Sequence, residues 1–102
     1  MRLSVKKLDG RIYFLFNGEL DDTTADGVRR VLDDVLGRES FSSIVLDMKN
    51  LTFMDSTGIG IIIGRYKRLK AIGKEIYIVN PSSQVDKILR TTGIYQIIKK
   101  IS

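Results

Sequence analysis

A ten-residue stretch from Phe53 to Ile62 (FMDSTGIGII) constrains the fold more than any other part of the chain. A strongly apolar run that ends at Val45-Leu46 precedes it, and an apolar pattern at helical spacing follows it. The stretch therefore predicts a corner where a strand passes into a helix, with Ser56 and Thr57 at the helix start. Unpaired backbone N–H groups and the positive end of the helix dipole favour a negative charge there, so the corner could accept a phosphate without disruption of the fold.

Composition narrows the classes of function. The chain has 102 residues, of which 43% are hydrophobic and 28% charged, as is typical of one soluble globular domain spanning residues 1–102. No apolar run approaches the roughly 18–20 residues of a membrane span, and the N-terminus lacks the apolar segment of a secretory signal. We therefore predict a cytoplasmic protein without a membrane partner.

Several kinds of chemistry are excluded or disfavoured. Cysteine and histidine are absent, which excludes thiol chemistry and leaves Ser56 without the commonest general base. Ile63 stands where a dinucleotide fingerprint beginning at Gly58 would need its third glycine. The net charge of +5 is spread along the chain, with neither interleaved aromatics nor a recognition helix. We predict no enzyme activity, no cofactor, no metal and no nucleic-acid partner.

Predicted strands and helices alternate along the chain. Five strands are expected at residues 3–8, 11–16, 43–48, 75–80 and 95–101, and three helices at residues 24–36, 57–72 and from Ser82 or Ser83 to Thr92-Gly93. The order β-β-α-β-α-β-α-β predicts an α/β domain with a mixed, mostly parallel sheet of about five strands, because strands separated by helices pair in parallel. The Asp9-Gly10 turn makes the first two strands an antiparallel hairpin.

The sequence also predicts where two helices end and how one strand is connected to the next helix. Gly37 is expected to end the first helix in the left-handed conformation, as Gly73 ends the second. Residues 50–55 are expected to form a loop that Leu51 and Phe53 pin to the core.

The second predicted helix has an unusual composition. Four residues at helical spacing form its core face: Ile59, Ile62, Tyr66 and Leu69. A flank beside that face is part apolar and part basic, and we expect it to be exposed: Ile61, Arg65, Arg68 and Ile72. Three glycines weaken the helix on propensity, and their small size would let a partner approach closely: Gly58, Gly60 and Gly64.

Ser56 has two interpretations from the residues alone. It is either the N-cap of the helix or a phosphate acceptor, and spacing alone favours the cap by about two to one. Asp55 could cap the helix, orient the Ser56 hydroxyl, or be phosphorylated itself. The last role would need a magnesium ion, for which four acidic side chains are available: Glu19, Asp21, Asp22 and Asp47.

Asp21 and Asp22 are likewise either caps of the first helix or exposed anions for a basic partner. They follow one predicted strand, and residues 55–57 belong to a strand-to-helix connection at the same edge. We therefore expect both groups to converge where open α/β sheets usually bind ligands.

Five segments carry a resemblance to a known family: Gly18-Glu19-Leu20-Asp21, Ile44-Val45-Leu46, residues 53–60, Gly64-Arg65-Tyr66-Lys67 and Ile72-Gly73. Over nearly its whole length the chain resembles the anti-sigma factor antagonists, which are stand-alone STAS domains (named for sulfate transporters and anti-sigma antagonists). The Asp-Ser-Thr-Gly-Ile-Gly segment is highly specific to that family, and it reverses the balance at Ser56 in favour of phosphorylation.

The resemblance implies a partner-switching function. In that family an anti-sigma factor serine kinase phosphorylates the residue that corresponds to Ser56, and a PP2C-type phosphatase removes the phosphate. Thr57 is the weaker candidate acceptor, and Asp21 resembles a residue that helps dock the kinase. The unphosphorylated antagonist binds the anti-sigma factor and so releases the sigma factor. Together with the corner and the flank, this predicts a partner-binding surface: Asp21, Asp22, Asp55, Thr57, Gly58, Ile61, Arg65 and Arg68.

Two alternatives stay open at this point. The chain could be a constitutive STAS scaffold of a transporter or signalling assembly, in which Ser56 only caps a helix. It could also be a small enzyme or nucleotide binder, which would have a deep pocket near Asp21 and Asp55. Family members also usually carry a further C-terminal helix, whereas this sequence stops at Ser102. We therefore expect part of one sheet face to be exposed and available to a second copy or another contact.

Overall fold

A tight hairpin opens the fold. The structure is a computed structural model that describes residues 1–101, so Ser102 lies outside the described residues. Strands β1 (Arg2–Leu8) and β2 (Arg11–Leu20) pair antiparallel. The turn between them has positive φ at Asp9 (53°) and Gly10 (76°), as in a type I′ turn, so the predicted Asp9-Gly10 hairpin is confirmed.

The rest of the chain alternates strands and helices. It comprises α1 (Ala25–Arg38), β3 (Ser43–Asp47), β4 (Leu51–Met54), α2 (Ser56–Ala71), β5 (Glu75–Val79), α3 (Ser83–Thr91), the 3₁₀ turn η1 (Ile94–Gln96) and β6 (Lys99–Lys100). The sheet order is β1-β2-β3-β5-β6 with β4 paired to β2, and every pairing except β1–β2 is parallel. This confirms the predicted α/β domain with three helices and a mixed sheet, which has six strands rather than about five.

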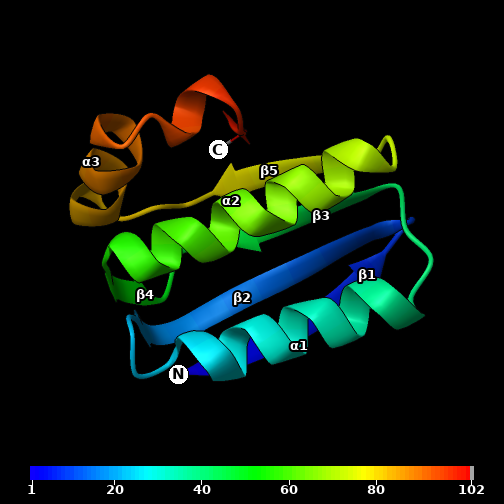
Figure 1. The fold of residues 1–102 in the computed structure, drawn as a ribbon, viewed down its shortest axis with the longest axis horizontal. Coiled ribbons are helices and arrows are strands. Elements are labelled where there is room, and N and C mark those ends of the chain that lie inside the picture. The colour runs from blue at the N-terminus through cyan, green and yellow to red at the C-terminus, as the bar shows by residue number, and fades with distance from the viewer. Residues whose placement is uncertain (102) are drawn as a thin grey trace.

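Helices α1 and α2 cover the same face of the sheet (Figure 1). The strands that face them contribute fully buried side chains, among them Ile12, Phe14, Ile44, Leu46 and Ile78. The predicted core face of the second helix is confirmed, because Ile59, Ile62 and Leu69 are buried and the half-buried Tyr66 packs at the margin of the core. Helix α3 lies beyond the carboxyl end of β5 and contacts β4, and η1 leads from α3 to β6.

The prediction for the end of the first helix is wrong. Gly37 lies inside α1, which continues to Arg38, and the following residue, Glu39, is extended. The last turn is held by the backbone N–H of Glu39, which donates to the Val35 carbonyl, and by an ion pair between Arg38 and Asp34. Gly73, by contrast, has a φ of 71° just after α2, as predicted.

The prediction of a loop at residues 50–55 is also wrong. Leu51 to Met54 form β4, which pairs in parallel with β2 because β2 continues past Gly18 to Leu20. Leu51 is buried, as expected, but Phe53 is 38% exposed and does not pin the segment to the core.

The last predicted strand is much shorter than expected. Of residues 95–101, only Lys99 and Lys100 pair with β5. The preceding residues coil as η1, where the backbone N–H of Ile98 donates to the Ile94 carbonyl at 2.8 Å.

Asp86 joins α3 to η1 and β6. Its carboxylate accepts hydrogen bonds from the Tyr95 hydroxyl at 2.6 Å and from the Lys100 ammonium at 3.1 Å, and it pairs with Arg90. The hydrogen bond from Tyr95, followed by that from Lys100, lowers the pKa of Asp86 below its ordinary value. The charged form of Asp86 therefore stabilises this corner of the fold.

Replacement of Asp86 by asparagine should show this stabilisation through its pH dependence. A carboxyl group with a lowered folded-state pKa stabilises the protein above its unfolded pKa of about 4, and this stabilisation is lost as pH falls through the folded pKa. We expect Asp86→Asn to lower the free energy of unfolding near pH 7 and the deficit to shrink near about pH 3, measured by urea unfolding. Asp26→Asn, at a side chain that is 85% exposed, is the control. A deficit at Asp86 that does not change with pH would contradict the assignment.

Candidate functional site

Two strand-to-helix corners lie side by side at the carboxyl ends of β2 and β4. Leu20, the last residue of β2, is the register partner of Met54, the last residue of β4. The backbone N–H of Asp55 donates to the Leu20 carbonyl at 3.3 Å. Asp21 and Asp55 therefore follow directly from paired residues, and the expected convergence of these two segments is confirmed.

Asp55 caps α2 and leaves Ser56 free of that task. The Asp55 Oδ1 atom accepts hydrogen bonds from the backbone N–H groups of Thr57 at 2.9 Å and Gly58 at 3.3 Å. Ser56 is the first residue of the helix, and its side chain is exposed, whereas Thr57 is half-buried. Of the alternatives that the sequence left open, the cap belongs to Asp55, and the Ser56 hydroxyl faces solvent at the positive end of the helix.

Asp21 holds the other corner in shape. Its Oδ1 atom accepts from the Thr23 hydroxyl at 2.7 Å, the Thr23 N–H at 3.0 Å and the Thr24 N–H at 3.2 Å. The hydrogen bond from the Thr23 hydroxyl is the main cause that lowers the pKa of Asp21, so this carboxylate is charged near neutral pH. Asp22 beside it is exposed. Asp21 and Asp22 thus present negative charge on a turn that the hydrogen bonds of Asp21 hold in place.

The packing around position 58 requires a glycine, because other side chains of the protein fill the space beside it. A Cβ atom built at Gly58 would lie 2.7 Å from Met54 Cγ and 2.9 Å from Leu20 Cγ. The expectation that a partner approaches Gly58 is therefore wrong, because α2 packs there on the ends of β4 and β2. A Cβ atom at Gly60 or Gly64 meets nothing within 4 Å, so these two glycines leave open space beside α2.

The flank of α2 is exposed only in part, because two of its four residues lie in or near the core. Ile61 is only 3% exposed, so the expectation that it lies on an exposed flank is wrong. Arg65, with a side chain 13% exposed, lies 3.2 Å from Asp33 of α1, and Arg68 lies 3.1 Å from the same carboxylate. Burial lowers the pKa of Arg65, and the charge of Asp33 opposes that shift. The two arginines therefore join the helices, although Arg68 and Ile72 keep much of their surface exposed.

Phe53 is the site residue that the sequence interpretation missed. It lies on β4 three positions before Ser56, and its ring is 38% exposed beside that corner. No local pattern marked it, because the short segment LTFM forms a strand only through its pairing with β2.

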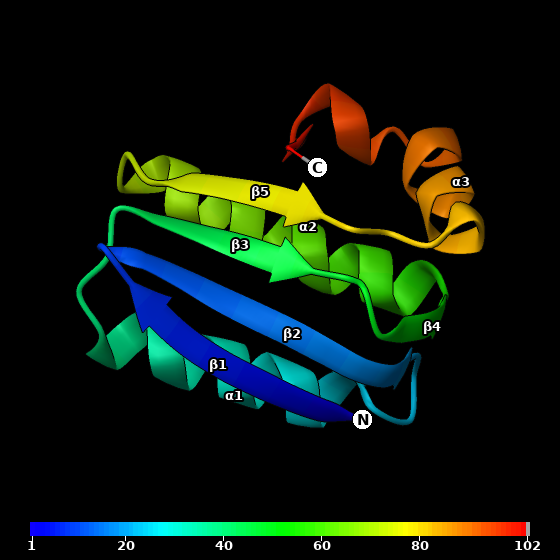
Figure 2. The same cartoon turned by 180° about the vertical axis from the view of Figure 1, so that it is seen from behind.

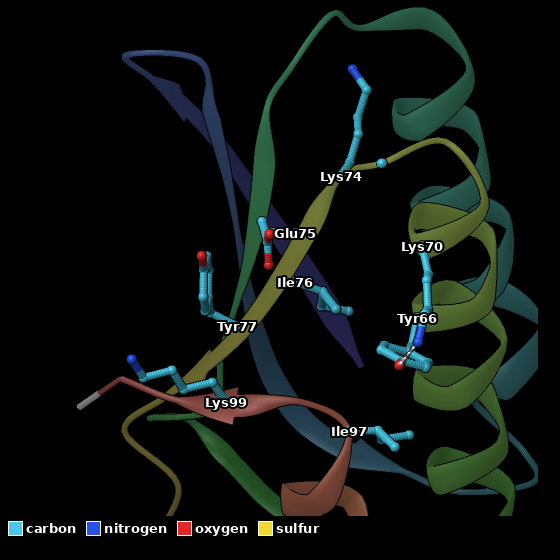
Figure 3. A pocket seen from close by; sticks show the side chains of 9 residues that line it. Tyr66, Lys70, Lys74, Glu75, Ile76, Tyr77, Ile97 and Lys99 are labelled. Atoms are coloured by element: carbon cyan, nitrogen blue, oxygen red, sulfur yellow. Dashed lines mark hydrogen bonds between the residues drawn. The ribbon is translucent and has the colours of Figure 1, made fainter.

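A pocket of about 470 Å³ lies away from both corners, between the C-terminal half of α2 and the outer edge of β5 (Figure 3). Its lysines do not converge on one point. Lys70 Nζ donates to the Tyr66 hydroxyl at 3.2 Å, Lys74 turns to the Phe41 ring and carbonyl, and Lys99 extends along the opposite side of β5 from Ile97. The pocket therefore lacks the clustered charge that a phosphate ligand would need.

Within residues 1–101, no three acidic side chains are placed to hold a metal ion together. The helices of this same range include none that is both long and apolar enough to cross a bilayer.

The structure is thus an α/β domain in which two strand-to-helix corners adjoin at one edge of a mixed sheet. The STAS domain family model matches residues 2–102. The chain is 35% identical over 97 residues to the anti-sigma F factor antagonist of Paenibacillus polymyxa, across 95% of this chain and 83% of that protein. The chain belongs to the STAS domain family, which confirms the resemblance in its sequence, and this relative is named as an antagonist of a regulatory factor, not as an enzyme.

The fold is also similar to solved structures of one such antagonist. Unphosphorylated SpoIIAA matches with a TM-score of 0.84 and 22% identity, over 99% of this chain and 89% of that chain. The phosphorylated form of Bacillus SpoIIAA matches with a TM-score of 0.75 and 22% identity, over 99% and 92% of the two chains.

Gly58 and Gly60 give a matched pair of substitutions. Gly58→Ala should destabilise the domain by about 1–3 kcal/mol, because its methyl group would overlap Met54 and Leu20. Gly60→Ala should stabilise it by up to about 1 kcal/mol, because alanine is the better helix former and the site is open. Urea unfolding measures both values. Equal effects of the two substitutions would show that Gly58 does not set the packing of this corner.

Asp33 and Asp34 form a second matched pair. Asp33→Asn should cost about 1–3 kcal/mol, because it removes the counter-ion of the largely buried Arg65. Asp34→Asn, at an exposed ion pair with Arg38, should change the free energy of unfolding by less than about 0.5 kcal/mol. Thermal or urea unfolding at low salt compares them, and a loss at Asp33 no greater than that at Asp34 would contradict a structural role for the cluster.

Proposed function

We propose that this chain is an anti-sigma factor antagonist that binds an anti-sigma factor serine kinase and is switched off by phosphorylation of Ser56. The exposure of the Ser56 hydroxyl at the start of α2, with the cap supplied by Asp55, carries the proposal. The relationship to the Paenibacillus polymyxa antagonist supports the role, and the two solved forms of SpoIIAA support a phosphorylation cycle. Binding of the unphosphorylated chain to the kinase releases the sigma factor.

The chemistry at Ser56 is a phosphoryl transfer. The γ-phosphoryl group of ATP passes to Ser56 Oγ, the hydroxyl proton is lost, and ADP leaves. The product carries about −1.5 to −2 charges, and the positive end of the α2 dipole tolerates that charge. Phosphorylation therefore changes the surface potential with little change of fold, and a PP2C-type phosphatase in the cytoplasm restores the hydroxyl.

The docking surface surrounds Ser56 and differs in part from the one that the sequence predicts. Its exposed members are Asp22, Phe53 and Gly60, with half-buried Thr57, Asp21 and Asp55 between them. Gly58 and Ile61 support this surface from beneath, since both are buried. A phosphate at its centre would be desolvated against the partner, and a loss of about 3–4 kcal/mol in binding is a several-hundred-fold switch.

The proposal is tested with the anti-sigma factor kinase encoded in the same genome. We expect incubation with that kinase and ATP to add one phosphate at Ser56, located by mass spectrometry. Ser56→Ala should abolish uptake, whereas Thr57→Ala should retain it. Ser56→Asp should weaken capture of the kinase by about a hundredfold or more, measured by calorimetry.

A separate control measures whether the Ser56 substitution changes the stability of the fold. Because Ser56 is exposed and Asp55 makes the cap, Ser56→Ala should change the free energy of unfolding by less than about 0.5 kcal/mol. Phosphate uptake by Ser56→Ala would overturn the assignment of the site. Undiminished capture of the kinase by Ser56→Asp would refute the switch and favour a constitutive STAS scaffold.

A further inference from the structure

The sheet face opposite α1 and α2 carries no helix within residues 1–101. Viewed from behind, β1, β2, β3 and β5 lie in front, with α1 and α2 beyond them (Figure 2). The strands β2, β3, β5 and β6 pair in parallel. Parallel sheets occur almost only where both faces are covered. This rear face therefore resembles the inner surface of a layered domain, although it faces solvent.

Apolar and aromatic side chains lie at the centre of the rear face. Tyr13, Val45 and Tyr77 are register partners on three neighbouring strands, so they form one row across the sheet. Val45 is 0% exposed although it points away from the helices, because it lies between the two tyrosines. The Arg11 guanidinium lies 5.3 Å from the centre of the Tyr77 ring. Tyrosine and arginine are enriched in protein interfaces.

A groove of about 500 Å³ adjoins this row along β1 and β2. Its apolar walls are Val5, Leu8, Tyr13 and Leu15, and Ser4, Lys6 and Asp47 also line it. Leu8 is 50% exposed, so it presents a large aliphatic surface at this groove. The groove has room for aliphatic side chains from outside the chain.

Charge indicates which kind of partner fits. Alternation along the paired strands places four cations on the rear face (Arg2, Lys6, Arg11 and Lys99) and two acids (Asp47 and Glu75), an excess of two positive charges. Figure 3 shows Lys99, Tyr77 and Glu75 on this side of β5, opposite Ile76. A second copy of the chain would bring like charges together, whereas an acidic partner would neutralise them.

We propose that the rear face binds an acidic amphipathic helix of a partner protein. Aliphatic side chains on one side of that helix enter the groove between Leu8 and Leu15, and its carboxylates pair with the cations of the face. A helix is the element that covers sheet faces in α/β domains. This surface is separate from the Ser56 corner, so the proposal does not depend on the proposed function.

The test uses a synthetic peptide of about five helical turns, with leucine along one face and glutamate and alanine elsewhere. We expect it to shift backbone amide signals of β1, β2, β3 and β5 in the NMR spectrum of the ¹⁵N-labelled chain. The same peptide with lysine in place of glutamate should not bind. Leu8→Glu should weaken binding about tenfold or more, whereas Ile72→Glu, at a 57% exposed isoleucine just after α2, should leave it unchanged.

Further measurements distinguish this partner from binding at the Ser56 corner and from a second copy of the chain. Ser56→Asp should bind the peptide as the unmodified chain does, and Leu8→Glu should still accept phosphate, so each proposal can fail alone. Equal binding of the lysine peptide, or shifts confined to another surface, would overturn the proposal. Sedimentation that shows a dimer of the free chain, lost in Leu8→Glu, would also overturn it and assign the face to a second copy.

Discussion

The parallel pairing of β2 with β4 is the interaction on which the site depends. It requires β2 to continue beyond Gly18, where φ is 120° and the register of the pairing shifts. The backbone N–H of Gly18 donates to the Asn50 carbonyl at 3.1 Å, so the start of β4 is fixed there. Leu20 then pairs with Met54, and both helix starts emerge at the same edge. Without this short strand, residues 50–55 would be a free connection, and Ser56 would have no fixed position relative to Asp21.

The three residues at the start of α2 divide their tasks in a way that suits a charge switch. Asp55 satisfies two N–H groups of the helix, and Gly58 brings the helix axis close to the strand ends. Ser56 between them takes part in neither task, so its chemistry can change while the backbone around it is held. If Ser56 itself capped α2, phosphorylation would break the hydrogen bond that holds the start of the helix. The structure therefore supports a switch that acts on the surface of a rigid corner.

Sequence reasoning succeeded where the pattern is local and strong. The Asp9-Gly10 turn, the three helices and the β3 and β5 strands follow from turn residues and periodicity, and all are present. The errors near the site involve non-local contacts. Phe53 and β4 depend on pairing with a strand thirty-four positions earlier, which no local pattern encodes. The prediction of an exposed flank is wrong in part because Ile61 is buried in the core. Arg65 also meets α1, where Asp33 offers a counter-ion that helical spacing on α2 does not show. The Ser56 corner was identifiable because its polar and glycine residues break the apolar pattern abruptly.

The arrangement of the two surfaces bears on how such a domain could be regulated. The Ser56 corner lies at the carboxyl edge of β2 and β4, whereas the rear face spans the middle of β1, β2, β3 and β5. The sheet between them is a continuous ladder with a densely packed core on one side, and such a structure resists small deformations. Allosteric coupling needs an element with two arrangements that both ligands bias differently. Because a packed core and a continuous sheet lie between the two surfaces, we expect the free energies of binding at the two to add. If both proposals hold, a chain held by an acidic partner at its rear face would still accept phosphate at Ser56.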